Sequence, residues 1–148
     1  MRDRIKNLIF REAASQARTT DGIALSPVDP GSRVLFVYAL ERKAEAFVSA
    51  FAPLRRRFWR HKIVFLTTDQ NFRPFMEGKA VFEQLPALEQ IAAFPDLMNW
   101  PRYLEDRHAL LHAKWRPHRA IAYGMPFATY VNTAKDLVSH DNSIAHDR

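Results

Sequence analysis

Three short, nearly continuous runs of apolar residues constrain the fold of this chain more than any other feature. They cover residues 34–39, 63–68 and 120–123. Each run is flanked by sequence with helical spacing of its apolar residues. Strands that read this way are typically buried on both faces, and such strands belong to parallel sheets covered by helices. The runs therefore predict an α/β fold, but they do not indicate a reaction.

The expected elements define one α/β domain over residues 33–138. Strands are expected at 33–39, 62–68, 79–85 and 119–123, and helices at 40–52, 86–94, 101–115 and 127–138. Either Asn99 or Trp100 can cap the helix that begins at Pro101. Consecutive parallel strands joined by a helix form right-handed units, so we expect a small, doubly wound, mostly parallel four-stranded sheet of order 3-2-1-4, which is Rossmann-like. Pro53 should end or kink the first helix, and residues 69–78 are expected to form a polar loop.

The two ends of the chain differ from this domain. Residues 1–32 are predicted to form an N-terminal helix and a linker, because helical spacing over residues 4–18 gives way to turn-forming dipeptides. The helix could bind a membrane surface or a partner, or it could pack on the domain or fray, which its short apolar face favours. Residues 139–148 are polar and are predicted to be a disordered tail.

The composition excludes several classes of site. The chain has no cysteine, which excludes disulfides, thiolate metal sites and cysteine nucleophiles. No apolar stretch approaches the roughly 18 residues of a membrane span, and the N-terminus has no apolar signal region, so a cytoplasmic location is expected. The formal net charge of +6 favours anionic partners such as nucleic acid, phosphorylated ligands or an acidic membrane surface.

A ligand site is expected at the carboxyl ends of the strands, where open parallel sheets bind their ligands. The first strand–helix junction, residues 38–42, has no glycine, which excludes a typical dinucleotide site. The polar loop from Thr67 to Asn71 suits hydrogen bonds to a sugar or ribose, although the same residue types are ordinary loop and cap residues. From topology, the candidate ligand-binding residues are Tyr38, Thr68, Asp69, Asn71, Glu83 and Tyr123.

Metal and nucleophile patterns are weak. His108 and His112 lie four residues apart on a predicted helix, as two zinc ligands can. However, Ala109 stands where a metalloprotease motif has its glutamate, so half-buried helix residues are the preferred interpretation and no metal or cofactor is expected. No serine lies in a nucleophile elbow, and whether the protein is an enzyme is left open.

A basic cluster precedes the second strand, at the end of the sheet opposite the expected ligand site. Arginines interleaved with aromatic residues suit phosphate contacts and base stacking. The alternative is a solvated loop in which Phe58 and Trp59 fold inward. The candidate nucleic-acid residues are Arg55, Arg56, Arg57, Trp59, Arg60 and Lys62.

Four segments carry a family resemblance: residues 34–37, 59–67, 82–86 and 114–122. Through them, residues 33–124 resemble the N-terminal Rossmann half of GT-B-type glycosyltransferases. The glycine-rich loop after the first strand is missing, as is the second domain that binds the nucleotide-sugar donor in that family. The resemblance implies a stand-alone or degenerate half that acts in carbohydrate or nucleotide-sugar metabolism and binds a sugar or nucleotide.

Two functional hypotheses follow. The first is this small α/β ligand-binding domain. The alternative is a non-enzymatic basic interaction module that binds nucleic acid or a protein partner. Since a four-stranded sheet leaves its edges open, a partner chain or a second copy of the chain could complete the sheet.

Overall fold

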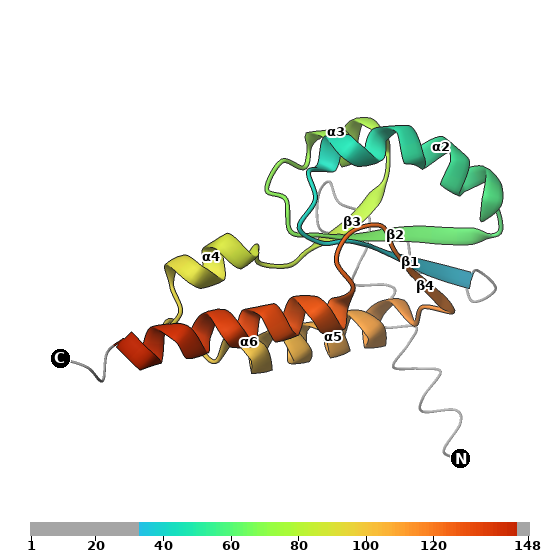
Figure 1. Cartoon of the computed structure of the whole chain (residues 1–148). Helices are drawn as coiled ribbons and strands as arrows, with labels where there is room; N and C mark the ends of the chain where they lie inside the picture. Colours follow the sequence, from blue (N-terminus) through green and yellow to red (C-terminus); the bar gives the residue numbers. More distant parts are fainter. Residues whose placement is uncertain (1–32, 145–148) are drawn as a thin grey trace, which may run out of the picture. The chain divides into compact units, whose positions relative to one another are not determined.

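The computed structural model describes residues 33–144 and contains a four-stranded sheet of order β3-β2-β1-β4 (Figure 1). The strands are β1 (Arg33–Ala39), β2 (His61–Thr67), β3 (Val81–Gln84) and β4 (Arg119–Ala122). All three strand pairings are parallel. The predicted α/β fold class and strand order are therefore confirmed.

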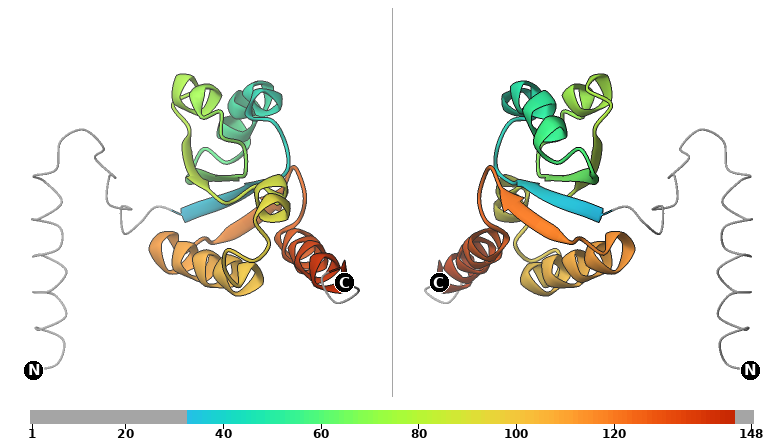
Figure 2. Two further views of the ribbon diagram at one scale, coloured as in Figure 1. Left: turned by 90° about the vertical axis from the view of Figure 1, so that its left-hand side faces the viewer. Right: turned by 90° about the vertical axis from the view of Figure 1, so that its right-hand side faces the viewer.

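Helices cover both faces of the sheet (Figure 2). One face carries the 3-10 helix η1 (Ala44–Phe47), α2 (Val48–Arg57) and α3 (Arg73–Glu77), and the other carries α5 (Trp100–Trp115) and α6 (Phe127–Ile144). The short helix α4 (Leu88–Ala93) lies beyond the carboxyl ends of the strands and packs on α6. Because the strands are parallel, all their amino ends share one edge of the sheet and all their carboxyl ends share the other.

The burial of the strands explains the apolar runs in part. β1 lies between β2 and β4, and all of its residues except Arg33 are buried, as a strand covered on both faces requires. Alternate residues of β1, such as Leu35 and Val37, join a core with Phe51 and Phe65 below α2. In contrast, Ala120 and Ala122 of β4 are exposed. The prediction of burial on both faces is wrong for this third run, because β4 is an edge strand.

The outer edge of β4 has no partner strand among residues 33–144. The expectation that another chain completes the sheet is not tested by this observation, and it stays a prediction.

Several element boundaries differ from the sequence-based expectations. The helix does not end at Pro53 but continues through it to Arg57. Pro53 is exposed, whereas Phe51 and Leu54 are buried against the sheet. An interior proline costs about 3 kcal/mol, while burying a large apolar side chain contributes about 1.5–3 kcal/mol. The free energy gained by burying Phe51 and Leu54 is therefore large enough to offset the cost of a proline inside the helix.

A second difference is that the expected polar loop contains helix α3. The Asn71 side chain accepts a hydrogen bond from the Arg73 N–H at 3.3 Å, Pro74 occupies the first turn, and Phe75 is fully buried. These are helix-start signals, and the buried Phe75 fixes the short helix to the sheet.

The last two helices follow their local signals. Of the two expected caps, Asn99 is the one that caps α5, by accepting a hydrogen bond from the Arg102 N–H at 3.2 Å, and Pro101 lies in the first turn as predicted. Helix α6 continues past Val138 to Ile144, so residues 139–144 are helical rather than a disordered tail. The predictions for residues 1–32 and 145–148 lie outside the described residues. Within residues 33–144, no helix is long and apolar enough to cross a membrane.

Candidate functional site

A cleft of about 660 Å³ lies at the carboxyl ends of β1 and β2, beside α4. Its walls are the β1–η1 loop, the β2–α3 loop and one side of α4. The polar residues that line it include Glu41, Arg42, Lys43, Thr68, Asp69 and Gln70. This volume is within the range of small-molecule sites in proteins, and the position is the one expected for an open parallel sheet.

Hydrogen bonds to the backbone build the walls of this cleft. The Thr68 hydroxyl accepts from the Glu41 N–H at 2.8 Å, and Asp69 Oδ2 accepts from the Ala44 N–H at 2.7 Å. Glu41 Oε1 accepts from the Leu88 N–H at 3.1 Å and so connects the loop to α4. Glu41 itself has a φ of 56°, a left-handed conformation that is uncommon outside glycine. These side chains therefore hold a strained loop in place.

The carboxylate of Asp69 is stabilised in its charged form. Burial alone would raise the pKa of Asp69, but the backbone N–H groups of Ala44 and Asn71 donate to it and Lys43 lies nearby. Together these interactions hold the pKa of Asp69 below its ordinary value. Asp69 is therefore a charged anchor of the loop at neutral pH.

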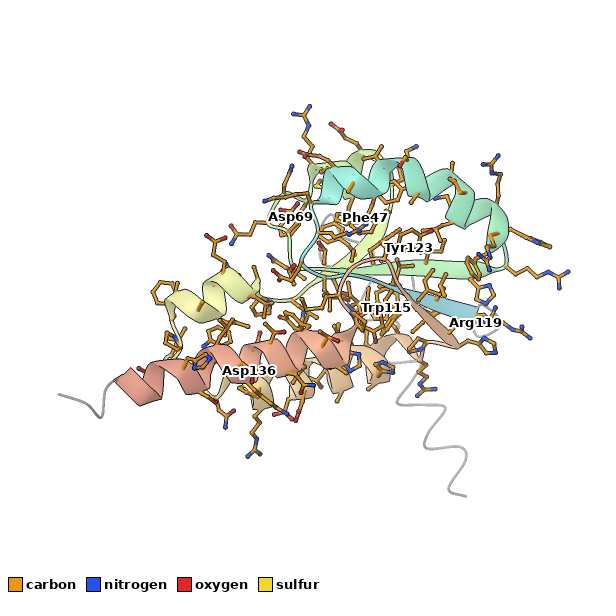
Figure 3. The ribbon with its side chains drawn as sticks, in the orientation of Figure 1. Phe47, Asp69, Trp115, Arg119, Tyr123 and Asp136 are labelled. Carbon is orange, nitrogen blue, oxygen red and sulfur yellow. The ribbon has the colours of Figure 1, made fainter. Side chains whose placement is uncertain are left out.

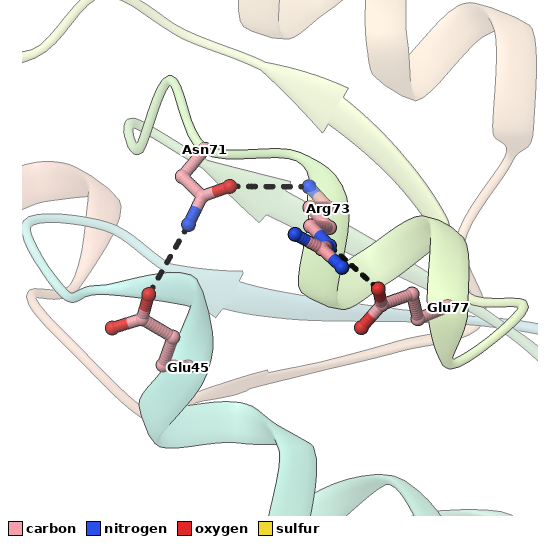
Figure 4. Close-up of polar contacts among 4 residues, drawn as sticks. All are labelled: Glu45, Asn71, Arg73 and Glu77. Atoms are coloured by element: carbon pink, nitrogen blue, oxygen red, sulfur yellow. Dashed lines mark hydrogen bonds and ion pairs between the residues drawn. The ribbon is translucent and has the colours of Figure 1, made fainter.

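The structure disperses the other four predicted ligand-binding residues. Asn71 donates from its amide to Glu45 at 3.2 Å and accepts from the Arg73 N–H at the start of α3, outside the cleft (Figure 4). Glu83 faces α5 and pairs with Lys114. Tyr38 points to α5 as well, and Tyr123 contacts the Phe47 ring below η1 (Figure 3). Only Thr68 and Asp69 line the cleft.

The crevice between β1 and β4, where the strand order reverses, is filled by the chain itself. Leu40 and Met125 form an antiparallel bridge across it. Between them, a Cβ atom on Gly124 would lie 2.3 Å from the Leu40 carbonyl oxygen, so only glycine permits this close approach. The cleft consequently opens over β1 and β2 instead of at the reversal point. The glycine at position 124 is the sequence signal of this closure.

Tyr38 and His108 form a half-buried pair between β1 and α5. The Tyr38 hydroxyl lies 2.6 Å from His108 Nε2, and the His108 ring stacks on Phe127 with centroids 3.8 Å apart. Burial, and then the neighbouring His112, lower the pKa of His108 to about 4, while burial raises the pKa of Tyr38 to about 12. Tyr38 therefore keeps its proton at neutral pH, and the imidazole of His108 that it contacts is uncharged.

This pair predicts a loss of stability in mild acid. The pKa of His108 is about 4 in the folded protein and near 6.5 when unfolded, so the unfolded state binds more protons between these values and stability falls as pH falls through this window. Because the ring is only half-buried, we expect His108 to contribute about 1–2 kcal/mol to this loss. Urea unfolding at several pH values measures it. His108→Gln keeps an acceptor for Tyr38 and should flatten the pH dependence; an unchanged slope would contradict the assignment.

The other edge of the sheet carries a second site, the amino-end face, defined here by Arg33, Arg57, Arg60, Arg116, His118 and Arg119. These residues are all exposed and come from the amino ends of β1 and β4, from the last residue of α2 and from the turns that precede β2 and β4. Arg33 lies opposite His61 in the β1–β2 register. Figure 3 shows nitrogen-tipped side chains around the labelled Arg119 at this edge.

Carboxylates do not neutralise this face. Within residues 33–144, none of its five arginines has an ion pair with a carboxylate. The two acids of the neighbouring α3 and β3 are already engaged, Glu77 with Arg73 and Glu83 with Lys114. The amino-end face is therefore a surface of uncompensated positive charge.

The predicted nucleic-acid residues lie on or beside this face. Arg55 and Arg56 belong to the last turn of α2, where the Arg55 side chain donates to the Gly78 carbonyl oxygen. Lys62 lies over the Trp115 ring, 5.0 Å from its centroid. Arg57, Trp59 and Arg60 are exposed in and after the end of α2. These residues are already neighbours in the sequence, and the fold adds Arg33, Arg116, His118 and Arg119 to them.

One of the two aromatic residues of this cluster is buried and the other is exposed. Phe58 folds inward and is 7% exposed, whereas Trp59 is 72% exposed. The guanidinium of Arg60 lies 4.5 Å from the centroid of the Trp59 ring, a cation–π arrangement. The alternative in which both rings fold inward is therefore correct for Phe58 and wrong for Trp59.

His61 lies behind the amino-end face, between the rings of Phe58 and His118. Its centroid is 5.6 Å from Phe58 and 6.0 Å from His118, and its two ring nitrogens are buried with no hydrogen-bond partner. Burial first, and then the charges of His118, Arg33 and Arg119, lower the pKa of His61. The positive charge of the face thus adds to the effect of burial on the pKa of His61. Sequence reasoning did not identify it.

A pocket of about 220 Å³ opens beside Trp59, between the end of α2 and the first residues of β2 and β3. Aromatic rings form much of its wall, and Arg55 and Lys79 also line it. The aromatic lining residues are Phe51, Phe58, Trp59, His61 and Phe65. No group of three or more potential metal ligands occurs in this pocket or elsewhere in residues 33–144.

Comparisons with protein-family models, curated proteins and solved structures found no match. The resemblance to glycosyltransferases consequently stays a prediction. Function is inferred below from the contacts and charges of the described residues.

Proposed function

We propose that this protein binds single-stranded nucleic acid through its amino-end face. The observation that carries the proposal is the convergence of arginines from separate segments at one edge of the sheet, without ion-paired carboxylates, together with the exposed Trp59 that lies under Arg60. Uncompensated arginines attract a phosphate backbone and release its counterions. An exposed aromatic ring gives an unpaired base a surface on which to stack.

A single strand fits this face better than a duplex. A duplex is read by an element that enters a groove, and the amino-end face consists of strand ends and short turns. Trp59 lies under the Arg60 guanidinium, and its ring can contact a base only where that base is unstacked. The arrangement therefore favours extended single strands and predicts little sequence preference.

Charge reversal tests the proposal. The triple variant Arg57→Glu, Arg60→Glu, Arg119→Glu should bind a single-stranded oligonucleotide about 10- to 100-fold more weakly at low salt. Three lost phosphate contacts should also reduce the slope of log K against log salt by about 2. Fluorescence anisotropy over a salt series measures both quantities.

The control reverses three exposed cations on other surfaces, Arg73→Glu, Arg102→Glu and Lys135→Glu, so that the net charge changes equally. This control should retain most of the binding at each salt concentration. Equal losses in the two triple variants would mean that net charge alone drives binding, and the proposed site would be wrong. No binding by the unaltered protein at low salt would refute the function itself.

A second candidate function is small-molecule binding in the carboxyl-end cleft, and the cleft's volume and position favour it. We propose a sugar or nucleotide-sugar ligand, as the glycosyltransferase resemblance implies. Arg42 and Lys43 supply cations for a phosphate, and Gln70 supplies an amide for hydroxyl groups. A thermal-shift screen of sugars, nucleotides and nucleotide sugars tests this candidate; a flat response from the folded protein would refute it.

A further inference from the structure

We infer that the pocket beside Trp59 receives one unpaired base of the bound strand. This inference rests on the proposed function and adds a base-binding subsite to it. The pocket measures about 220 Å³, which is smaller than the roughly 300–1,000 Å³ of sites for drug-sized ligands. Its size suits a single planar ring system better than a whole nucleotide.

The walls of the pocket suit a flat aromatic occupant. Phe51 comes from α2, Phe58 directly follows α2, Phe65 comes from β2, and all three are buried in the core. Phe51 and Phe65 pack edge to face with centroids 5.1 Å apart, so this part of the wall is rigid. Trp59 stands at the pocket with most of its surface exposed. A base at the pocket can therefore stack on Trp59 without displacing any core side chain.

Cations beside the pocket match the phosphates that flank such a base. Arg55 is held in place by its hydrogen bond to the Gly78 carbonyl oxygen. Lys79, which follows Gly78 in the chain, is exposed. Lys79 has a φ of 50°, so its backbone belongs to a tight turn at the amino end of β3. Arg60, over the Trp59 ring, adds a third cation.

This combination distinguishes the occupant from other candidates. An apolar side chain of a protein partner would fill the aromatic pocket but would gain nothing from Arg55, Lys79 and Arg60. An anionic membrane would use these cations but has no flat ring to stack on Trp59. A nucleotide unit carries both the ring and the charge, so the strand is the occupant that the charges and the rings favour together.

Trp59 provides the experiment with its own probe. Of the three tryptophans, Trp100 and Trp115 are 6% and 3% exposed, whereas Trp59 is 72% exposed. A base stacked on Trp59 should quench the exposed fraction of the fluorescence. We therefore compare a short thymidine oligonucleotide with an abasic strand of the same length and charge. The base-containing strand should bind about 5- to 150-fold more tightly, and it alone should quench.

Variants separate the stacking from the charge. Trp59→Ala should reduce the advantage of the base-containing strand to about onefold to threefold while the abasic strand binds as before. The matched control, Phe94→Ala, removes another exposed aromatic ring, which is 62% exposed, and should change neither affinity. Lys79→Asn, which tolerates the left-handed backbone, should weaken both strands equally.

The outcomes distinguish the inference from the function on which it rests. If both strands bind equally and Trp59 fluorescence does not change, the base subsite is wrong although the amino-end face still binds polyanions. If neither strand binds at low salt, the proposed function fails and the subsite fails with it. Binding to anionic vesicles in the absence of strand binding would assign the face to a membrane surface and would overturn both.

Discussion

Replacing Phe65 by alanine is expected to lower the free energy of unfolding by about 3–5 kcal/mol. Phe65 lies on β2, is 3% exposed and packs against Phe51 and Phe75 with centroids 5.1 and 5.4 Å away. Its removal would leave a cavity at the centre of the core below α2. The neighbouring aromatic rings are rigid and can collapse only partly into it. Urea unfolding followed by circular dichroism measures the loss.

Two comparisons make this result specific. Phe65→Leu keeps most of the apolar volume and should cost less than half as much. Phe94→Ala removes an exposed ring and should stay within about 0.5 kcal/mol of the unaltered protein. A loss below about 1 kcal/mol for Phe65→Ala would mean that α2 does not pack on β2 as described, and the pocket beside Trp59 would then lose its wall.

Replacing Glu83 by alanine is the second large expected effect, a loss of about 2–3 kcal/mol. Glu83 Oε1 accepts from Trp115 Nε1 at 2.8 Å and from the Lys114 ammonium, while Arg107 lies 3.6 Å from Oε2. The glutamate side chain is 11% exposed. Alanine would leave the buried indole N–H without an acceptor, which is costly, whereas the partly exposed cations can turn to solvent.

The variant Glu83→Gln separates the two contributions, because its amide oxygen can still accept from Trp115 but carries no charge. We expect it to lose about half as much stability as Glu83→Ala. Thermal and urea unfolding of both variants measure this difference. If Glu83→Ala were as stable as the unaltered protein, the connection between β3 and α5 would not matter for folding, and a ligand-binding role for Glu83 would regain interest.

These contacts show why the candidate site could be predicted only in part. The carboxyl-end positions of Thr68 and Asp69 follow from the strand order, and the structure places both at the cleft. Glu83 also lies near the carboxyl end of its strand. However, its side chain points to the face of the sheet that α5 covers, because the side chains of neighbouring strand residues point to alternate faces. Asn71 has the residue type of a ligand-binding amide, but its side chain bonds to Glu45 and to the Arg73 N–H at the start of α3. Residue type and topology do not specify which partner a side chain meets.

The basic cluster shows the reverse case. Its composition is visible in the sequence, whereas the convergence of Arg33, Arg60 and Arg119 is not, because they are distant along the chain. Only the parallel sheet brings these amino ends to one edge. Adjacent residues can also diverge: Phe58 is buried and Trp59 is exposed, and the direction of the chain at the end of α2 decides which ring meets the core.

The sequence by itself determined the fold class and the order of the strands. Continuous apolar residues in β1 and β2 require cover on both faces, and right-handed connections then allow few arrangements. Only the tertiary structure decided that β4 is an exposed edge, that Leu40 and Met125 close the reversal point, and that arginines from separate segments gather at the amino-end edge of the sheet. The physical reason is that local pattern reports how much surface a segment must bury, whereas a site depends on which distant side chains face one another across that burial.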